Sequence, residues 1–232
     1  MKTGTLTKID GTTHLYEMRK LGTEHLEEIE TLQQTVIAEM PIKEYCDALS
    51  QQELLNVLGE RGLTLGVFVE GKCVGFHAVL FPGLDEENLG YDWGLDSKQL
   101  MQAAHLEIVL IYPEYRGNGL QQLMAKELLE MLNKMENIRY VFETVHPLNT
   151  PSVKNTLKHD VVIVELKEKY QGTLRYIFMQ DLQQPILIDE ASVVEVRQED
   201  ITKQQQLLKN GYVGFDLIKS GDKVNVLFAK KR

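Results

Sequence analysis

The stretch from Ile111 to Leu129 carries the residues best suited to chemistry, because small residues lie where an apolar strand meets a helix. The strand pattern ends at Ile111, and helical spacing of leucine and methionine begins after Gly119. Gly117 and Gly119 let the chain bend sharply there. The first N–H groups of a helix lack partners inside it and, with the helix dipole, favour a phosphate or pyrophosphate. Arg116 adds positive charge, so these residues predict an anion cradle.

The cradle matches neither of two common nucleotide-binding motifs. No Gly-Lys-Ser/Thr follows the turn, which excludes a Walker loop, and the GxGxxG fingerprint is absent. A glycine-rich turn also serves purely structural purposes, since glycine adopts left-handed turn conformations. From the residues alone, that structural interpretation stays open.

Two side chains of the preceding strand could move a proton. His105 and Glu107 share the parity of Ile111, so all three are expected on one side of the sheet. A histidine titrates near neutrality, and burial raises the pKa of a carboxyl, so either suits a general base. The alternatives are a half-exposed His105 at the start of the strand and a paired structural carboxylate at Glu107.

Hydrophobic periodicity predicts the elements that must position these residues. Strands are expected over 14–19, 64–70, 72–80, 105–111, 140–145, 161–166 and 175–181, and helices over 26–37, 49–59, 119–135 and within 147–158. Residues 82–100 form a long acidic, glycine-rich loop, which is either functional or a solvated insertion. Together these elements predict an α/β (α+β) fold with a mixed sheet flanked by helices.

The C-terminal part is expected to form a small extension. Residues 184–232 read as strand, helix, strand and strand. Residues 156–166 align without gaps with 207–217, which indicates either an internal repeat or two ordinary helix–strand junctions. The expected domains are therefore residues 1–183 and a C-terminal α/β extension of residues 184–232.

Composition excludes several classes of protein. The 232 residues carry a net charge of −9, whereas nucleic-acid binders are usually basic. No apolar run is long enough to span a membrane, and residues 1–10 lack the apolar core of a secretory signal. Cys46 and Cys73 form no CxxC pair, which excludes a disulfide scaffold and a thiolate zinc cluster. We expect a cytoplasmic protein without metal, nucleic-acid or membrane partners.

The segment VLIYPEYRGNGLQ (109–121) resembles motif A of the GNAT family of acyl-CoA-dependent N-acyltransferases. That motif joins an apolar strand, a proline and R/Q-x-x-G-x-G/A at a helix start. Arg116 and Gly119 match it, but the final Gly/Ala position is Gln121. The segment HPLNTPS (146–152) resembles the start of motif B. The resemblance covers about three-quarters of the chain and implies a mostly antiparallel GNAT-like sheet.

The resemblance implies that acetyl-CoA is the cosubstrate. The strand backbone would pair with pantetheine, the turn would hold the pyrophosphate, and two motif B residues would lie near the thiol. The residues so implied are Val109, Leu110, Ile111, Arg116, Gly117, Asn118, Gly119, Leu120, Gln121, Asn149 and Ser152.

The implied reaction is direct attack of an amine on the thioester, with His105 or Glu107 as base. Family members commonly place a tyrosine acid seven residues after the motif B asparagine, where this chain has Thr156. Asp92 and Trp93, in the acidic loop, could attract and cover an amine of a small molecule or peptide.

The alternative is an acyl-CoA-binding sensor without turnover, which Gln121 and Thr156 favour. Unpaired strands of the extension would need a partner, which makes a homodimer an expectation as well.

Overall fold

The computed structural model describes residues 2–170 and 172–232, and the chain divides into two compact units. The first unit comprises Met1–Pro82 and Ala104–Glu136, and the second comprises Gly83–Ala103 and Asn137–Arg232. The boundary expected at residue 184 falls inside the second unit.

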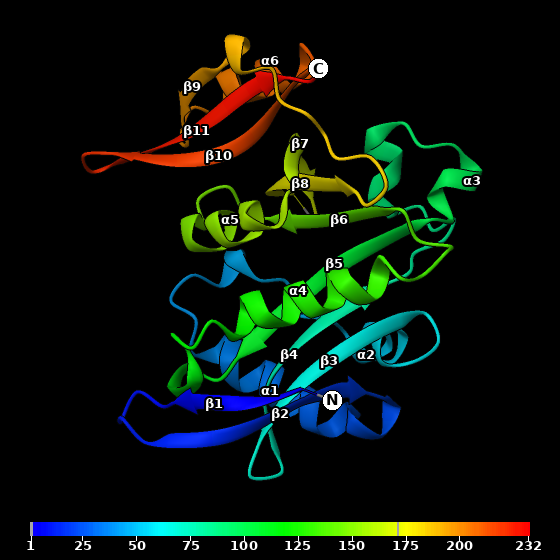
Figure 1. The fold of residues 1–232 in the computed structure, drawn as a ribbon, viewed down its shortest axis with the longest axis vertical. Coiled ribbons are helices and arrows are strands. Elements are labelled where there is room, and N and C mark those ends of the chain that lie inside the picture. The colour runs from blue at the N-terminus through cyan, green and yellow to red at the C-terminus, as the bar shows by residue number, and fades with distance from the viewer. Residues whose placement is uncertain (1, 171) are drawn as a thin grey trace. The chain divides into compact units, whose positions relative to one another are not determined.

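The first unit is built on antiparallel strands in the order β1-β2-β3-β4-β5. Figure 1 shows α4 in front of β3 and β4, with α1 and α2 behind them. The strands are β1 (Lys2–Thr7), β2 (Thr13–Leu21), β3 (Gly62–Val69), β4 (Lys72–Leu80) and β5 (Ala103–Ile111). The helices are α1 (Leu26–Ala38), α2 (Gln51–Leu58) and α4 (Leu120–Leu132). The mixed α/β architecture and mostly antiparallel pairing confirm the predicted fold class.

The hydrophobic pattern does not predict strand β1. Of its residues only Leu6 is buried, so no apolar alternation marks it in the sequence. Its register with β2, from Lys2 opposite Met18 to Thr7 opposite Thr13, shows that backbone pairing holds it in place.

The second unit consists largely of two successive strand–helix–strand–strand repeats. Its strand order is β6-β8-β7-β10-β11-β9. The two repeats meet at the β7–β10 pair, and outward from that pair their strands follow in the same order. The first repeat is β6 (Tyr140–Val145), α5 (Thr150–Thr156), β7 (Val162–Lys169) and β8 (Thr173–Asp181). The second is β9 (Val194–Arg197), α6 (Ile201–Lys209), β10 (Tyr212–Ser220) and β11 (Lys223–Lys230).

Local geometry recurs in both repeats at the 51-residue offset of the sequence alignment. Asn149 and Asp200 each cap a helix, and each side chain accepts a hydrogen bond from the N–H three residues on. Asp160 and Gly211, which follow the two helices, both have left-handed backbone, with φ of 56° and 80°. Capping and turn geometry therefore favour an internal repeat over two unrelated junctions.

The β-strand irregularities recur as well. Within the β7–β8 pair the register shifts between Ile163 and Glu165, and within the β10–β11 pair it shifts between Gly214 and Asp216. Ile163 and Gly214 are equivalent in the repeat and are paired with each other across β7 and β10. Equivalent residues meet in this way when two antiparallel copies are related by a local two-fold axis.

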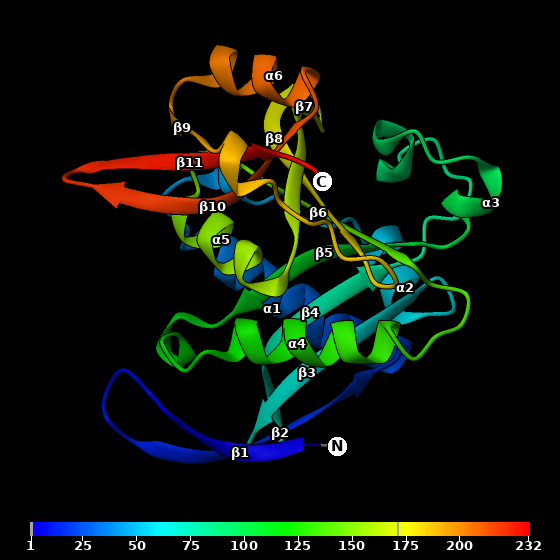
Figure 2. The same ribbon diagram turned by 45° about the horizontal axis from the view of Figure 1, so that its top comes forward.

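Both repeats contribute to one hydrophobic core. Val153 of α5 and Leu208 of α6 belong to the same buried cluster. Figure 2 shows α6 beside β7, and the second repeat supplies side chains that are 2% exposed or less. These are Val196, Val226 and Phe228.

The loop predicted over residues 82–100 covers part of β6 and β8. It contains a 3₁₀ turn (Leu89–Trp93) and the short helix α3 (Ser97–Leu100). Leu89, Leu95 and Leu100 share a buried cluster with Phe142 and Met179 of the two strands. Asn88 ties the loop together by donating to the carbonyl oxygens of Gly83 (2.6 Å) and Leu100 (3.2 Å). The loop is therefore not a solvated insertion.

Deleting the second repeat should unfold the second unit. A chain ending at Gln183 would expose the core that α6, β9 and β11 cover, and each large side chain left uncovered costs roughly 1.5–3 kcal/mol. We expect an aggregated product, measured by size-exclusion chromatography and circular dichroism. A soluble remnant with cooperative unfolding would instead show that residues 184–232 are a separate extension.

Candidate functional site

The sharp turn between β5 and α4 leaves open space above its backbone. Gly117 and Gly119 have left-handed backbone, with φ of 82° and 68°. A Cβ placed on either glycine would meet no heavy atom within 4 Å. Because side chains do not cover these glycines, a ligand can approach the main chain directly.

The start of α4 supplies hydrogen-bond donors at this turn. Gly119 is the N-cap, and the first intrahelical bond runs from the Leu123 N–H to the Gly119 carbonyl oxygen (3.0 Å). The N–H groups of residues 120–122 precede that bond and lie at the positive end of the helix dipole. The exposed Arg116 adds a guanidinium, whose Nε donates to the Ile111 carbonyl oxygen (3.3 Å). The predicted anion cradle therefore has the required donors.

The side chain of Asn118 stabilises the turn. Its Oδ1 accepts a hydrogen bond from the Thr7 N–H, and its Nδ2 donates to the Thr7 carbonyl oxygen, both at 2.8 Å. The amide thus pairs with β1 much as another strand would. Only the backbone of Asn118 is left for an anion, and the same holds for Leu120, whose side chain is buried.

His105 and Glu107 lie side by side on β5, as their parity relative to each other predicts. The His105 Nδ1 is 3.4 Å from the Glu107 Oε1, and their side chains are 5% and 21% exposed. The expectation that His105 is half-exposed is therefore wrong, because the strand start is covered. Glu107 is the more accessible of the two and is a paired carboxylate.

A β-bulge lies beside this pair. His77 of β4 is opposite Val109, whereas Val79 is opposite Leu106, so β5 has one extra residue between these pairs. Because of this extra residue, His105, which is opposite Leu80, and Ile111, which is opposite Gly75, face opposite sides of the sheet. The expectation that they share a face is therefore wrong. Val109 and Ile111 are partly exposed, whereas the Leu110 side chain is buried and can contribute only its backbone.

The two motif B residues meet at the N-terminus of α5, in the second unit. The Asn149 side chain accepts a hydrogen bond from the Ser152 N–H (3.4 Å). Asn149 therefore acts as a helix cap, which gives its spacing to Ser152 a structural reason.

Glu143 is a candidate residue that the sequence reasoning missed. It lies on β6, and the Thr156 hydroxyl of α5 donates a hydrogen bond to its Oε1 (3.0 Å). Burial raises the pKa of Glu143 to about 7, and the bond from Thr156 opposes that shift. A carboxyl that titrates near neutrality can exchange a proton at physiological pH. The signal in the sequence is a lone acid within the apolar strand YVFETV, comparable to Glu107 in HLEIVLI.

Asp92 and Trp93 are occupied by lysines of the same chain. Asp92 forms an ion pair with Lys167, and the Lys231 ammonium lies 4.1 Å from the centre of the Trp93 ring. The predicted cation–π geometry is thus present, with a lysine of the chain as the cation. A substrate amine that used these two groups would have to displace both lysines.

Two further findings limit the chemistry. Burial raises the pKa of Cys73 to about 12, so this thiol is not a nucleophile at neutral pH. Among the described residues, no group of three or more His, Cys, Asp or Glu side chains could hold a metal ion.

No helix in the described part of the chain is long and apolar enough to cross a membrane.

Comparison with solved structures places this chain among proteins of one fold. A GNAT-family acetyltransferase from Streptococcus pneumoniae covers 72% of this chain and 99% of its own length, with 18% identity and a TM-score of 0.55. NAA60 of Arabidopsis thaliana, in complex with acetyl-CoA, covers 73% and 99%, with 16% identity and a TM-score of 0.58. An N-acetyltransferase from Staphylococcus aureus covers 73% and 99%, with 9% identity and a TM-score of 0.55.

The chain therefore has the GNAT fold. No protein-family model and no curated protein sequence matches it. The fold is shown by structure, and the motif A resemblance remains a sequence-based prediction.

The pKa of Glu143 predicts a pH dependence of stability. An ordinary glutamate has a pKa of 4.5 and folded Glu143 has one of about 7, so the folded state holds more protons between these pH values. Stability contributed by Glu143 should fall as pH rises through this window, by on the order of 3 kcal/mol. Urea unfolding of the native chain and Glu143→Gln measures this loss.

The variant should lack most of this pH dependence. Thr156→Val is the matched change, because removing the bond that lowers the pKa should move the transition to higher pH. Parallel profiles for the native chain and Glu143→Gln would contradict the assignment.

Proposed function

We propose that this protein is an N-acetyltransferase that moves the acetyl group of acetyl-CoA to a primary amine. The observation that carries the proposal is the open, left-handed glycine turn at the start of α4. The GNAT fold supports it, since one similar structure contains acetyl-CoA.

Backbone groups are proposed to do most of the binding. The N–H groups of residues 117–121 would hold the pyrophosphate, with the guanidinium of Arg116 adding charge. The Arg116 N–H, which the resemblance to motif A included, already donates to the Pro113 carbonyl oxygen (3.1 Å). The backbone of residues 109–111 would pair with pantetheine as an added strand does. Asn149 and Ser152 are proposed to lie near the thiol end, as the motif B resemblance implies.

Glu107 is the proposed general base, with His105 as its partner. Attack requires a neutral amine, so a proton must leave the nitrogen before or during bond formation. Glu107 is accessible, and His105 can hold or pass a proton across the 3.4 Å that separates them. The new bond forms between the amine nitrogen and the acetyl carbon, and the carbon–sulfur bond breaks.

The departing thiolate has no tyrosine acid at the family's usual position. Thr156 occupies it, and its hydroxyl donates to Glu143. Thr156 is thus unsuited as an acid, whereas a thiolate is a tolerable leaving group without one. This departure is also what favours the alternative function, an acyl-CoA sensor without turnover.

The acceptor is proposed to be a small-molecule or peptide amine. Asp92 and Trp93 are the proposed groups that attract it, in exchange for Lys167 and Lys231. A cytoplasmic location, absence of metal, and a homodimer are further parts of the proposal.

Acetyl-CoA binding should depend on the bare backbone at Gly117. Gly117→Ala should raise the dissociation constant at least about tenfold, because a methyl group would occupy the space meant for the pyrophosphate. Isothermal titration with acetyl-CoA and with CoA measures this change.

Gly71→Ala is the matched control. Gly71 has φ of 83° and the same open surroundings, but it lies in the β3–β4 hairpin. Both substitutions cost about 1–2 kcal/mol of stability through backbone strain, so only the binding loss is specific to the cradle. Equal affinities for the two variants would refute the assignment.

Glu107 should control turnover and leave binding intact. Glu107→Gln should lower kcat roughly 10²–10⁴-fold, the usual contribution of a general base, with the affinity for acetyl-CoA unchanged. Thiol release from acetyl-CoA on a panel of amines measures this loss, and Glu130→Gln, an exposed change on α4, is the control.

The same assay separates the two functions. Release by the native chain on any amine supports the transferase. Tight binding with no release on the whole panel would support the sensor.

A further inference from the structure

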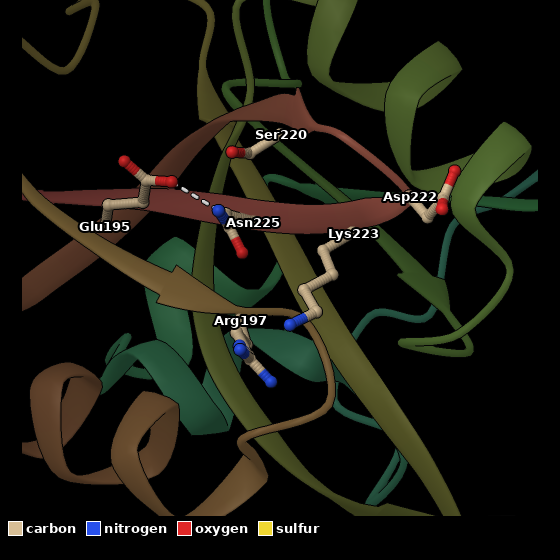
Figure 3. Close-up of a pocket in the computed structure, with 6 residues that line it drawn as sticks. All are labelled: Glu195, Arg197, Ser220, Asp222, Lys223 and Asn225. Atoms are coloured by element: carbon tan, nitrogen blue, oxygen red, sulfur yellow. Dashed lines mark hydrogen bonds between the residues drawn. The ribbon is translucent and has the colours of Figure 1, made fainter.

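A polar hollow of about 660 Å³ lies on the second repeat (Figure 3). Val196, Val226 and Phe228 point into the core, so their strand neighbours face the other way. The hollow is lined by Glu195, Arg197, Ser220, Asp222, Lys223 and Asn225. None of these residues belongs to the cradle at α4 or to the groups proposed for acetyl transfer.

Asn225, which lines this hollow, holds a buried acceptor without a donor. The residue is only 9% exposed, and its Oδ1 accepts no hydrogen bond among the described residues. Its Nδ2 donates to the Glu195 carboxylate, which fixes the orientation of the amide. Figure 3 shows the oxygen directed toward Arg197 and Lys223. A buried acceptor without a donor is destabilising, and a donor on a ligand would remove that cost.

Two cations, Arg197 and Lys223, line the hollow together with the carboxylates of Glu195 and Asp222. Arg197 lies opposite Asn225 in the β9–β11 register, and Lys223 lies two residues before Asn225 on the same face. Neither forms an ion pair within residues 2–170 and 172–232, although Glu195 is close by on β9. Adjacent like charges attract an anion, and a guanidinium binds a carboxylate with two parallel hydrogen bonds.

These groups together restrict the ligand. A simple anion would satisfy the cations but would place negative charge against the Asn225 oxygen. A simple cation would satisfy that oxygen but would meet Arg197 and Lys223. A carboxylate with a nitrogen donor on the neighbouring carbon satisfies both.

The first repeat holds a polar side chain at the position equivalent to Asn225. Leu166 pairs with Tyr176, and the equivalent Leu217 pairs with Val226. Tyr176 and Val226 are therefore equivalent, so β8 and β11 correspond at an offset of 50 residues, one fewer than the helices. Arg175 is therefore the counterpart of Asn225, and it is only 3% exposed. Both repeats bury a polar group here, but only the second has an acceptor beside free cations.

We propose that the hollow binds an α-amino acid or the carboxyl terminus of a peptide. Arg197 and Lys223 hold the carboxylate, and Asn225 Oδ1 accepts a hydrogen bond from the amine or amide nitrogen. Glu195 positions Asn225.

Four small probes test this chemistry on the full chain by two-dimensional ¹⁵N–¹H NMR. Glycine carries a carboxylate and an ammonium, and N-acetylglycine carries a carboxylate and an amide N–H. Acetate and methylammonium each carry one charge only. We expect amide shifts in residues 194–197 and 223–226 with glycine, N-acetylglycine or both, and binding of the single-charge probes at least about tenfold weaker.

The two sources of ligand give different results. Glycine alone would indicate a free amino acid, and binding of N-acetylglycine would indicate a peptide terminus. Acetate as effective as either, shifts confined to other residues, or no shifts with any probe would overturn the proposal.

Lys223→Gln should weaken binding at least about tenfold. Lys219→Gln is the matched control, because Lys219 is exposed on the same hairpin but pairs with Val224 and faces the other side. The rest of each spectrum should superimpose on that of the native chain. Equal affinities for the two variants would also overturn the proposal.

Discussion

The close approach of β7 and β10 at Gly214 is the constraint on which the second unit depends. A Cβ at Gly214 would lie 2.9 Å from the Ile163 side chain and 3.2 Å from Phe228, both of which are fully buried. No larger residue fits there without moving the core. Because Ile163 and Gly214 are equivalent in the repeat, one copy has the bulky side chain and the other has the space for it.

In the first unit, the turn between β5 and α4 must expose its main-chain N–H groups and still keep its conformation. Glycine supplies the exposure but leaves the turn flexible in the unfolded chain. Asn118 compensates, since its amide forms two hydrogen bonds with Thr7. The cradle at α4 therefore depends on β1, although β1 contributes no residue to it.

Much of this architecture could be predicted from hydrophobic periodicity, because most strands and helices bury one regular face. The β6 strand, for example, is found over the residues that the pattern predicts. Strand β1 could not be predicted, since its stability comes from backbone pairing. The role of the loop over residues 83–103 depends on its contacts with β6 and β8, which are distant in sequence.

The same distinction applies to the candidate site: local sequence predicts some of its features, and others depend on contacts that form only in the folded chain. Strand parity correctly placed His105 beside Glu107 but not on the face of Ile111, because the bulge in β5 could not be predicted. Glycine spacing correctly indicated a sharp bend. The partners of Asp92, Trp93 and Asn118 could not be predicted, because Lys167, Lys231 and Thr7 reach them only in the folded chain. The sequence shows Glu143 as an acid in an apolar strand, but its raised pKa depends on burial in the folded chain.

The repeat also bears on how this chain reaches its native state. Strands β7 and β10 present similar patterns at a shared edge, so an unfolded chain contains two similar partners for each strand. Chains with internal repeats are prone to exchange equivalent elements between molecules while they fold. In this protein Gly214 acts against such exchange, because a β7–β7 pairing between two molecules would bring Ile163 against a second isoleucine where the native pairing has a glycine.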